Sequence, residues 1–246
     1  MNLILLENQD FLGPTLVRLR GRRKQHIVDV HRAAVGDRLK VGKLEGRIGT
    51  GEIIALSDHE LTMEVHLERQ PPPTLPVTLL LALPRPKMLR RILQTISSMG
   101  VKQLYLINSY RVDKSFWGSP LLCQDKLREQ LILGLEQACD TVLPVIHQRP
   151  RFKPFVEDEL PGIIGSSSAF LAHPDSNTVC PVEFPRPTTL AIGPEGGFIP
   201  YELEKFRSCG FQPVSLGARI LRVETAVPVL LSRMNLSVAE ARHEKE

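Results

Sequence analysis

The spacing of hydrophobic positions divides this chain into a β-rich first part and a longer part in which strands and helices alternate. Before residue 70 the apolar runs are short and separated by glycines, and residues 61–67 alternate with a period of two, as half-buried strands do. Three consecutive prolines indicate a stiff linker and a domain boundary at residues 70–74. The first part therefore predicts a small β-barrel, with strands over residues 27–30, 38–41, 47–54 and 61–67.

Residues beyond 75 show the alternation that is typical of βαβ units. The run 77–83 is apolar except for Thr78, as in a strand buried on both faces, and residues 87–99 place their apolar side chains on one helical face. The fold class is therefore α/β with a mostly parallel sheet, followed by a frayed tail at 239–246. Other helices are expected over 121–139, after Pro200 and at Glu224, and other strands at 101–107, 144–147, 162–165, 169–173, 189–192 and 213–216.

Composition narrows the class of protein. No apolar stretch approaches the length of a membrane span, and the first residues lack the positive leader of a secretory signal. The four cysteines are scattered without C-x-x-C spacing, and the seven histidines show no ligand spacing. These features predict reduced thiols, no metal site, no membrane segment and a cytoplasmic location.

Positive charge is concentrated near the beginning of the chain. Residues 1–47 hold ten Lys and Arg residues against five acidic ones, although the whole chain carries a net charge of only +4. This distribution favours a phosphate-backbone partner bound by a separate module, and the alternative is a basic surface that only aids solubility. The candidate RNA-binding residues are Arg20, Arg22, Arg23, Lys24, His26 and Arg32. His26 and Arg32 could instead serve only to build the barrel.

Two segments near the C-terminus carry the most specific chemistry. Residues 190–197 and 216–226 each read as a buried strand that enters a glycine-bearing loop and then opens a helix. Such loops place backbone N–H groups and helix N-termini around a small polar ligand, although a bare G-x-x-G-G is also typical of a tight structural turn. The first βα turn lacks G-x-G-x-x-G, and Phe198 rather than Lys follows Gly197, which excludes a dinucleotide fingerprint and a P-loop. An apolar pocket lined by backbone suits adenosine better than a triphosphate.

The sequences Ile-Gly-Pro-Glu-Gly-Gly at 192–197 and Leu-Gly-x-Arg-Ile-Leu-Arg-x-Glu-Thr at 216–225 identify a family resemblance. Over nearly its whole length the chain resembles the ribosomal RNA small subunit methyltransferase E family. That family uses S-adenosylmethionine to methylate N3 of a uridine, uracil-1498, in 16S rRNA of the small ribosomal subunit. The resemblance implies a PUA-like β-barrel RNA-binding domain over 1–70 and a SPOUT methyltransferase domain with a trefoil knot over 75–240. It also implies a homodimer with each active site at the subunit interface.

The same resemblance implies the residues of the cofactor site. Arg222 is also the catalytic candidate, because the uridine N3 proton must leave and a cation can stabilise the charge that develops at the uracil oxygens. A structural pairing of Arg222 with Glu224 or Glu195 is the alternative. The expected cofactor-binding residues are Ala172, His173, Ile192, Gly193, Pro194, Gly196, Gly197, Leu216, Gly217, Ile220, Leu221, Arg222 and Thr225.

Three positions depart from the family pattern. Ser98, Tyr110 and Asp140 stand where the family usually has Glu, Glu and Arg, whereas the cofactor loops are intact. A methyltransferase of the same class that acts on a different RNA is therefore a second hypothesis. A third is a non-catalytic RNA-binding factor of ribosome assembly that keeps the fold, against which the intact cofactor loops count.

Overall fold

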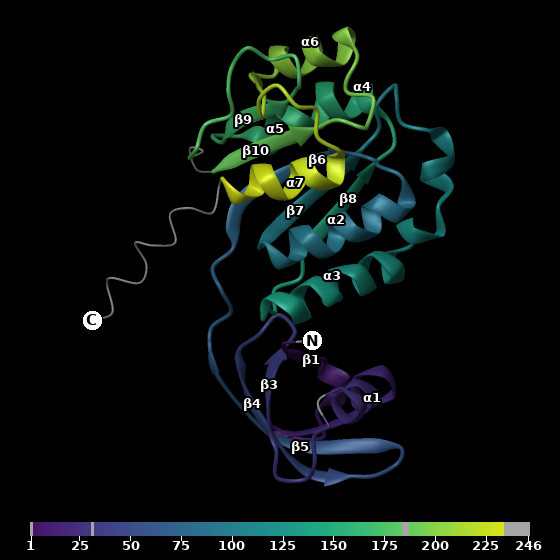
Figure 1. Ribbon diagram of the computed structural model, residues 1–246, viewed down its shortest axis with the longest axis vertical. Coiled ribbons are helices and arrows are strands. Elements are labelled where there is room, and N and C mark those ends of the chain that lie inside the picture. The colour runs from purple at the N-terminus through teal and green to yellow at the C-terminus, as the bar shows by residue number, and fades with distance from the viewer. Residues whose placement is uncertain (1, 31, 184–186, 234–246) are drawn as a thin grey trace, which may run out of the picture. The chain divides into compact units, whose positions relative to one another are not determined.

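A computed structural model describes residues 2–30, 32–183 and 187–233 of the chain (Figure 1). The chain forms two compact units, one running from its beginning to Pro73 and including Leu131–Leu143, the other holding Thr74–Gln130 and the chain from Pro144 onward. The division after Pro73 falls within the proline-rich segment at 70–74. Residues 234–240 of the expected second domain and the expected tail at 239–246 lie outside the described residues.

The first unit is built on a five-stranded sheet. Its strands follow the order β1-β3-β4-β5-β2, with β1 parallel to β3 and the other pairs antiparallel. No strand pairing joins β1 to β2 among the described residues, so the sheet is half a barrel and the predicted β-barrel is not confirmed. The strands are β1 (Ile4–Leu6), β2 (Leu16–Arg20), β3 (Arg38–Lys43), β4 (Ile48–Leu56) and β5 (Glu60–Arg69), with a 3-10 turn at Asn8–Asp10.

The prediction of a strand at 27–30 is wrong, because these residues end helix α1 (Gly21–Asp29). Gly21 has a φ of +60°, and this left-handed residue turns the chain out of β2 into the helix. Ile27 is fully buried against the sheet, whereas Val30 is 63% exposed. The β-branched residues Ile27 and Val30 suggest a strand locally, but only Ile27 has a place in the core, and tertiary packing decides the outcome.

A separate short segment completes the first unit. Leu135 is fully buried in a cluster with Leu3, Leu5 and Ile48. The carbonyl of Glu136 accepts hydrogen bonds from the N–H groups of Asn2 and Leu3 at 3.1 and 3.0 Å. These contacts explain why residues 131–143 belong with the beginning of the chain, which the hydrophobic pattern did not predict.

The second unit is built on a six-stranded sheet in which every pairing is parallel, as the alternating pattern predicted. The strand order is β11-β9-β10-β6-β7-β8, so β10 and β6 occupy its centre. β10 is buried along its whole length, including Thr188 and Thr189 at its start, as expected for a strand covered on both faces. The strands are β6 (Leu75–Ala82), β7 (Val101–Ile107), β8 (Val145–Arg149), β9 (Ser168–Ala172), β10 (Thr188–Ile192) and β11 (Gln212–Val214).

Helices cover this sheet. Figure 1 shows α2 and α7 side by side on one face, and α4 packs on α6 through the rings of Phe152 and Phe206, whose centroids lie 5.6 Å apart. The predicted strand at 162–165 is wrong, because this segment ends α5 and Gly165, at φ +51°, closes that helix. The helices are α2 (Pro86–Ser98), α3 (Gln124–Ala138), α4 (Phe152–Pro154), a π turn (Phe155–Glu159), α5 (Leu160–Ile164), α6 (Pro200–Ser208) and α7 (Val223–Ser232), with 3-10 turns at Lys114–Gly118 and Pro120–Leu122.

Two negative findings apply to the described part of the chain. None of its helices is long and apolar enough to cross a membrane. None of its groups of His, Cys, Asp and Glu is arranged to hold a metal ion.

Candidate functional site

A pocket opens where three neighbouring parallel strands end. β9 lies between β10 and β11 in the sheet, and all three strands run in the same direction, so their carboxyl ends meet at one edge. This is the position at which open parallel sheets bind ligands. The lining residues are Ala172, His173, Pro174, Ile192, Gly193, Pro194, Glu195, Gly197, Val214, Ser215, Leu216, Gly217, Arg219, Ile220, Leu221, Val223 and Ala226.

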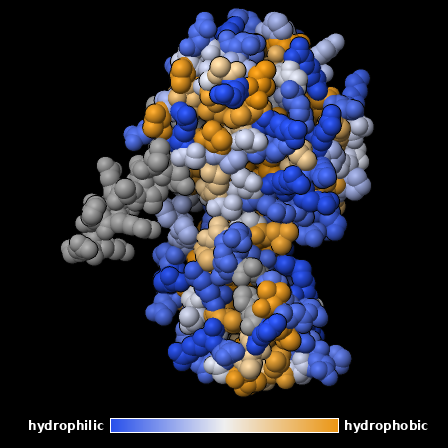
Figure 2. All heavy atoms as spheres, in the orientation of Figure 1, coloured by the Kyte–Doolittle hydropathy of each residue, from blue (hydrophilic) through white to orange (hydrophobic). Residues whose placement is uncertain are grey.

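The walls of the pocket suit a small organic ligand. The pocket encloses about 640 Å³ of empty space when the part that is open to solvent is included. Apolar side chains form much of the wall, and Ile220 is 79% exposed although it is a large hydrophobic residue. Figure 2 shows apolar side chains gathered on the viewed face of this unit, over α7 and the loops beside it. A ligand with an apolar face would cover such a wall.

Two glycines hold the loops of the pocket in conformations that other residues rarely adopt. Gly197 has a φ of +72° and Gly217 a φ of +107°, and both line the pocket. Gly197 donates its N–H to the carbonyl of Pro194 at 2.8 Å, which closes the turn after β10. The backbone of both loops therefore reaches the ligand space without side chains in between.

His173 contributes a polar group to the pocket wall. Its Nδ1 atom is buried and has no hydrogen-bond partner among the residues described, while its Nε2 atom lies 3.8 Å from the exposed carboxylate of Asp175. A buried polar atom without a partner has a free-energy cost that a bound ligand or water would remove. The arrangement fits S-adenosylmethionine, which combines an adenosine with polar groups.

Most of the cofactor residues expected from the sequence come together in this pocket, but three do not line it. A Cβ atom on Gly196 would lie 2.9 Å from Cδ of Arg111, so the open side of this glycine faces that arginine. Arg222 is exposed and precedes α7 as its N-cap residue, where its carbonyl accepts the N–H groups of Thr225 and Ala226. Thr225 points to solvent on the first turn of α7.

The alternative role of Arg222, a structural pairing with Glu224 or Glu195, is not seen within the described ranges. The guanidinium of Arg222 has no hydrogen-bond or ion-pair partner among them. A cation next to Val223, which lines the pocket, is therefore available for a ligand at the pocket edge.

Sequence reasoning missed several lining residues. Val214 and Ser215 lie at the end of β11, and Pro174 follows β9, so the rule that ligands bind at strand ends could have found them. Arg219 stands inside the second glycine-bearing motif and lines the pocket, whereas Arg222 in the same motif does not. The other missed residues are Glu195, Val223 and Ala226.

A buried carboxylate outside the pocket holds the first glycine-bearing loop through hydrogen bonds. Glu202 of α6 is 2% exposed and accepts hydrogen bonds from the N–H of Ile199 at 3.0 Å, the N–H of Tyr110 at 2.7 Å and the hydroxyl of Ser109 at 3.1 Å. Arg111 also donates a hydrogen bond to the carbonyl of Gly196. The turn after β7 is thus fastened to the loop after β10, although about 90 residues of sequence separate them.

The three departures from the family pattern lie outside the pocket. Ser98 ends α2 and donates its hydroxyl to the carbonyl of Thr95 at 2.8 Å. Asp140 is buried in the first unit, where its carboxylate accepts the N–H groups of Thr141 and Val142. Tyr110 is 80% exposed on the turn after β7.

In the first unit, the candidate RNA-binding residues differ in how strongly they are bonded to other residues of the protein. Arg20 pairs with Glu60 at 2.6 Å while 61% exposed, and this hydrogen bond lowers the pKa of the Glu60 carboxyl. Lys24 donates to the carbonyl of Asp58 at 3.2 Å on the surface. His26 is half-buried, and Arg32 is exposed at a φ of +51°.

Arg23 requires a correction, because its guanidinium lies inside the unit. It is 18% exposed, donates to both oxygens of buried Asp10 at 2.5 and 2.7 Å, and also donates to the carbonyl of Leu5 at 2.8 Å. These bonds use the fork of the guanidinium. Arg23 is therefore a structural residue and leaves the set of candidate RNA contacts.

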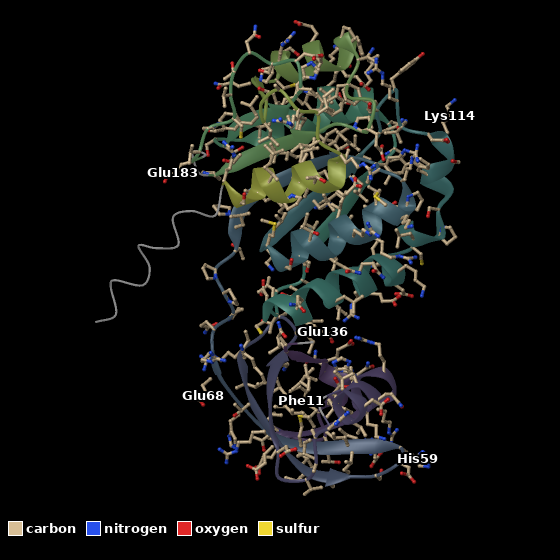
Figure 3. All side chains as sticks on the ribbon, in the orientation of Figure 1. Phe11, His59, Glu68, Lys114, Glu136 and Glu183 are labelled. Atoms are coloured by element: carbon tan, nitrogen blue, oxygen red, sulfur yellow. The ribbon has the colours of Figure 1, made fainter. Side chains whose placement is uncertain are left out.

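Arg22 pairs with a carboxylate that is unusually buried. Its guanidinium is 57% exposed and lies 3.3 Å from both oxygens of Glu136, whose side chain is 3% exposed on α3 (Figure 3). Burial raises the pKa of the Glu136 carboxyl, and the attraction of Arg22 offsets this only in part.

Comparisons with known proteins define the class to which this fold and pocket belong. Residues 70–235 match the RNA methyltransferase domain family. A ribosomal RNA small subunit methyltransferase E from Treponema pallidum (strain Nichols) is 30% identical over 232 residues, which cover 92% of this chain and 87% of the relative. The chain is an RNA methyltransferase.

Solved structures show the same fold along nearly the whole chain. A ribosomal RNA small subunit methyltransferase E from Neisseria gonorrhoeae, bound to S-adenosyl methionine, superposes with a TM-score of 0.74 at 20% identity and covers 96% of this chain and 97% of its own. A methyltransferase from Legionella pneumophila, in complex with the cofactor SAM, gives a TM-score of 0.73 at 23% identity and covers 94% and 95%. By sequence, the chain belongs to the ribosomal RNA small subunit methyltransferase E family.

Proposed function

We propose that this protein transfers a methyl group from S-adenosylmethionine to N3 of one uridine in 16S rRNA of the small ribosomal subunit. The observation that carries the proposal is the pocket at the ends of β9, β10 and β11, where both glycine-bearing loops meet in a chain of this family. The solved relative from N. gonorrhoeae, which is bound to S-adenosyl methionine, supports the choice of cofactor.

The finer features of the family belong to the same proposal. They are a PUA-like RNA-binding first unit, a trefoil knot in the C-terminal part of the second unit, a homodimer with its active sites at the subunit interface, and action in the cytoplasm. The half barrel formed by β1–β5 supports the first of these, and the exposed Ile220 beside the pocket is compatible with a covering partner.

The residues of the pocket suit different parts of the cofactor. The apolar wall and the loop backbone around Gly193, Gly197 and Gly217 suit the adenosine. Nδ1 of His173 and the guanidinium of Arg219 suit the polar end, because a cation and a hydrogen-bonding nitrogen both complement a carboxylate. S-Adenosylmethionine would supply an electrophilic methyl group carried by a sulfonium.

Arg222 is the proposed catalytic residue. N3 of neutral uracil is a poor nucleophile, so its proton must leave before or as the new bond to carbon forms. The negative charge then spreads onto the two uracil oxygens, where a fixed cation stabilises it. Arg222 offers an exposed guanidinium without a partner in the described part of the chain, directly before the α7 residues that line the pocket.

Methyl transfer to small ribosomal subunits that lack uridine N3 methylation tests the proposed function. With labelled S-adenosylmethionine, we expect labelled 3-methyluridine at a single 16S site. Cofactor binding by calorimetry without label in 16S rRNA, but with label in another RNA, would favour the hypothesis of a different RNA target. A protein that binds no cofactor would leave only the non-catalytic hypothesis.

An arginine series tests the catalytic assignment. Arg222→Ala is expected to lower kcat by about 10²- to 10³-fold, the effect of removing one donor to a developing oxyanion, with the cofactor Kd unchanged. Arg222→Lys should recover part of this rate, because the charge remains. Arg207→Ala on α6 is the matched control. This arginine is also exposed, and its ion pair with the exposed Glu204 is long, at 4.0 Å. Equal rates for the wild type and Arg222→Ala would remove Arg222 from the mechanism.

The proposed RNA surface of the first unit now comprises Arg20, Arg22, Lys24, His26 and Arg32. Replacing Lys24 or Arg32 by Ala should weaken RNA binding and reduce the slope of log K against log salt by about 0.7–0.9 for each lost phosphate contact. Cofactor affinity should stay unchanged. Arg38→Ala is the control, because Arg38 is 74% exposed and pairs with Glu52 on the same sheet.

A further inference from the structure

The turn that follows β7 is held rigidly against the glycine-bearing loop of the pocket. Its first residue, Ser109, is 2% exposed and bonds through its hydroxyl to Glu202, and Val112 at its other end is 6% exposed. The N–H of Tyr110 donates to the same carboxylate at 2.7 Å. Both ends of this short turn are therefore buried, and the backbone between them is bonded to Glu202 through the N–H of Tyr110.

Arg111 connects the turn directly to the pocket loop. Its guanidinium donates to the carbonyl of Gly196, and its Cδ atom occupies the space in which a side chain at Gly196 would lie. The two neighbours of Gly196, Glu195 and Gly197, line the pocket. The turn thus stands at the rim of the cofactor pocket without being part of its wall.

Tyr110 and Arg111 are the exposed residues of this turn, and of the two only Arg111 is bonded to the pocket loop. The side chain of Tyr110 is 80% exposed, the most of any large hydrophobic side chain found exposed in the described part. Its ring makes no contact with another ring or cation, and its hydroxyl makes no hydrogen bond, within that part. By contrast, Tyr105 stacks on His147 at 4.3 Å, and Tyr201 lies 5.7 Å from the ammonium group of Lys205.

A rigidly mounted, exposed ring beside a methyl-donor pocket matches the way in which proteins hold single-stranded RNA. Unpaired bases stack on aromatic side chains, and a uridine that is methylated at N3 must be unpaired during the reaction, because N3 is its Watson–Crick donor. The target base must enter the pocket to reach the methyl group. Because Tyr110 does not line the pocket, its ring is placed for a different base.

We infer that Tyr110 is a stacking platform for an unpaired nucleobase that adjoins the target uridine in the RNA substrate. This inference rests on the proposed function and deepens it, since it names a specificity contact of the same site. Glu202 and Arg111 act as positioning residues for this contact, because they fix the turn to α6 and to the loop of Gly196.

Ring substitutions and a short RNA probe test the inference. The probe is a single-stranded, uridine-rich RNA of about 10 nucleotides, close to the site size of single-strand binders, with one 2-aminopurine whose fluorescence reports stacking. Tyr110→Ala is expected to weaken its binding about 5- to 150-fold, the loss of one base–aromatic stack. Tyr110→Phe and Tyr110→Trp should bind like the wild type, because they keep a ring face.

Kinetics and a matched control separate this contact from a general structural effect. With small ribosomal subunits, Tyr110→Ala should raise KM for RNA by a similar factor, with little change in kcat and none in the cofactor Kd. Tyr201→Ala removes the other exposed tyrosine, which is 48% exposed on the neighbouring α6, and should leave RNA binding unchanged.

Several outcomes would overturn the inference. Unchanged probe binding by Tyr110→Ala would do so, as would an equal loss for Tyr110→Phe, which would point to the hydroxyl instead of the ring. A change in oligomeric state at unchanged RNA affinity would place Tyr110 in a protein interface. A wild type that binds the probe through Tyr110 but transfers no methyl group would refute the proposed function and leave the stacking contact standing.

Discussion

Glu202 offers the most direct test of how the cofactor loop is held. Its buried carboxylate accepts three hydrogen bonds, from Ile199 in the loop before α6 and from Ser109 and Tyr110 in the turn after β7. Glu202→Gln keeps the shape of the side chain. One oxygen continues to accept from Tyr110, but an NH₂ group now faces the N–H of Ile199, while the rotatable hydroxyl of Ser109 can turn to accept.

The expected loss of stability follows from the number of hydrogen bonds that each variant loses. An N–H in the interior that loses its acceptor costs about 1–3 kcal/mol, and the N–H of Ile199 is partly buried, so Glu202→Gln should lower the melting temperature by at most about 2–12 °C at roughly 2–4 °C per kcal/mol. Glu202→Ala leaves two backbone N–H groups without an acceptor and should cost about twice as much. Since a displacement of about 1 Å at a reacting site can reduce rates up to ~10²-fold, methyl transfer should fall by more than the stability change alone explains.

The assay combines thermal unfolding, cofactor calorimetry and methyl transfer to small subunits. Glu204→Gln is the matched control, because Glu204 lies on the same helix but is exposed, and its change should stay within about 0.5 kcal/mol. A Glu202→Gln protein that melts within ~1 °C of the wild type, a limit below the cost of one lost hydrogen bond, and that binds cofactor equally would refute the positioning role.

Three further predictions address other parts of the structure. Gly217→Ala should strain the left-handed backbone at φ +107°, at about 1–3 kcal/mol, and weaken cofactor binding in calorimetry, whereas Gly118→Ala, which has open space and no left-handed φ, should do neither. Arg23→Ala removes the cationic partner of buried Asp10, although the N–H of Glu7 still donates to it, and should cost about 3–5 kcal/mol in urea unfolding, whereas Arg20→Ala at its exposed pair should cost far less. Because burial raises the pKa of Glu136, its contribution to stability is present below pH 4.5 and lost as the pH rises through the raised pKa. We therefore measure the melting temperatures of Glu136→Gln and the wild type from pH 4 to 8. The value for Glu136→Gln minus that for the wild type should increase as the pH rises, and a constant difference would contradict the assigned pKa shift.

Much of the second unit could be predicted because its signals are local. A parallel strand buried on both faces reads as a mostly apolar run, and β6 shows such a run, whereas β10 combines two threonines with Leu-Ala-Ile and is still buried throughout. The same applies to the pocket, since each glycine-bearing loop follows directly from the strand before it, and the sheet order then brings the two loops together. Short segments were predicted less well, because residues 27–30 and 162–165 are too short for their periodicity to distinguish a strand from the end of a helix.

The basic cluster shows where local reasoning about charge reaches its limit. Arg22, Arg23 and Lys24 are adjacent in the sequence and were predicted to act alike. The structure separates them, because successive positions on α1 point in different directions: Arg23 reaches Asp10, Arg22 reaches Glu136 and Lys24 stays at the surface. The partner of each residue comes from another element, and the sequence around the cluster contains no information about it.

The same limit explains why the support of the cofactor loop was not predicted. Glu202 and Glu204 both stand near the start of α6, where local rules assign them one role, favourable interaction with the helix dipole. Only the fold distinguishes them, since Glu202 points inward to the turn after β7 and Glu204 points to solvent. That turn carries both Tyr110, the proposed RNA contact, and Arg111, which is bonded to the loop of Gly196. A single buried carboxylate therefore fixes the cofactor loop and the proposed base platform relative to each other, as alignment of N3 with the methyl group requires.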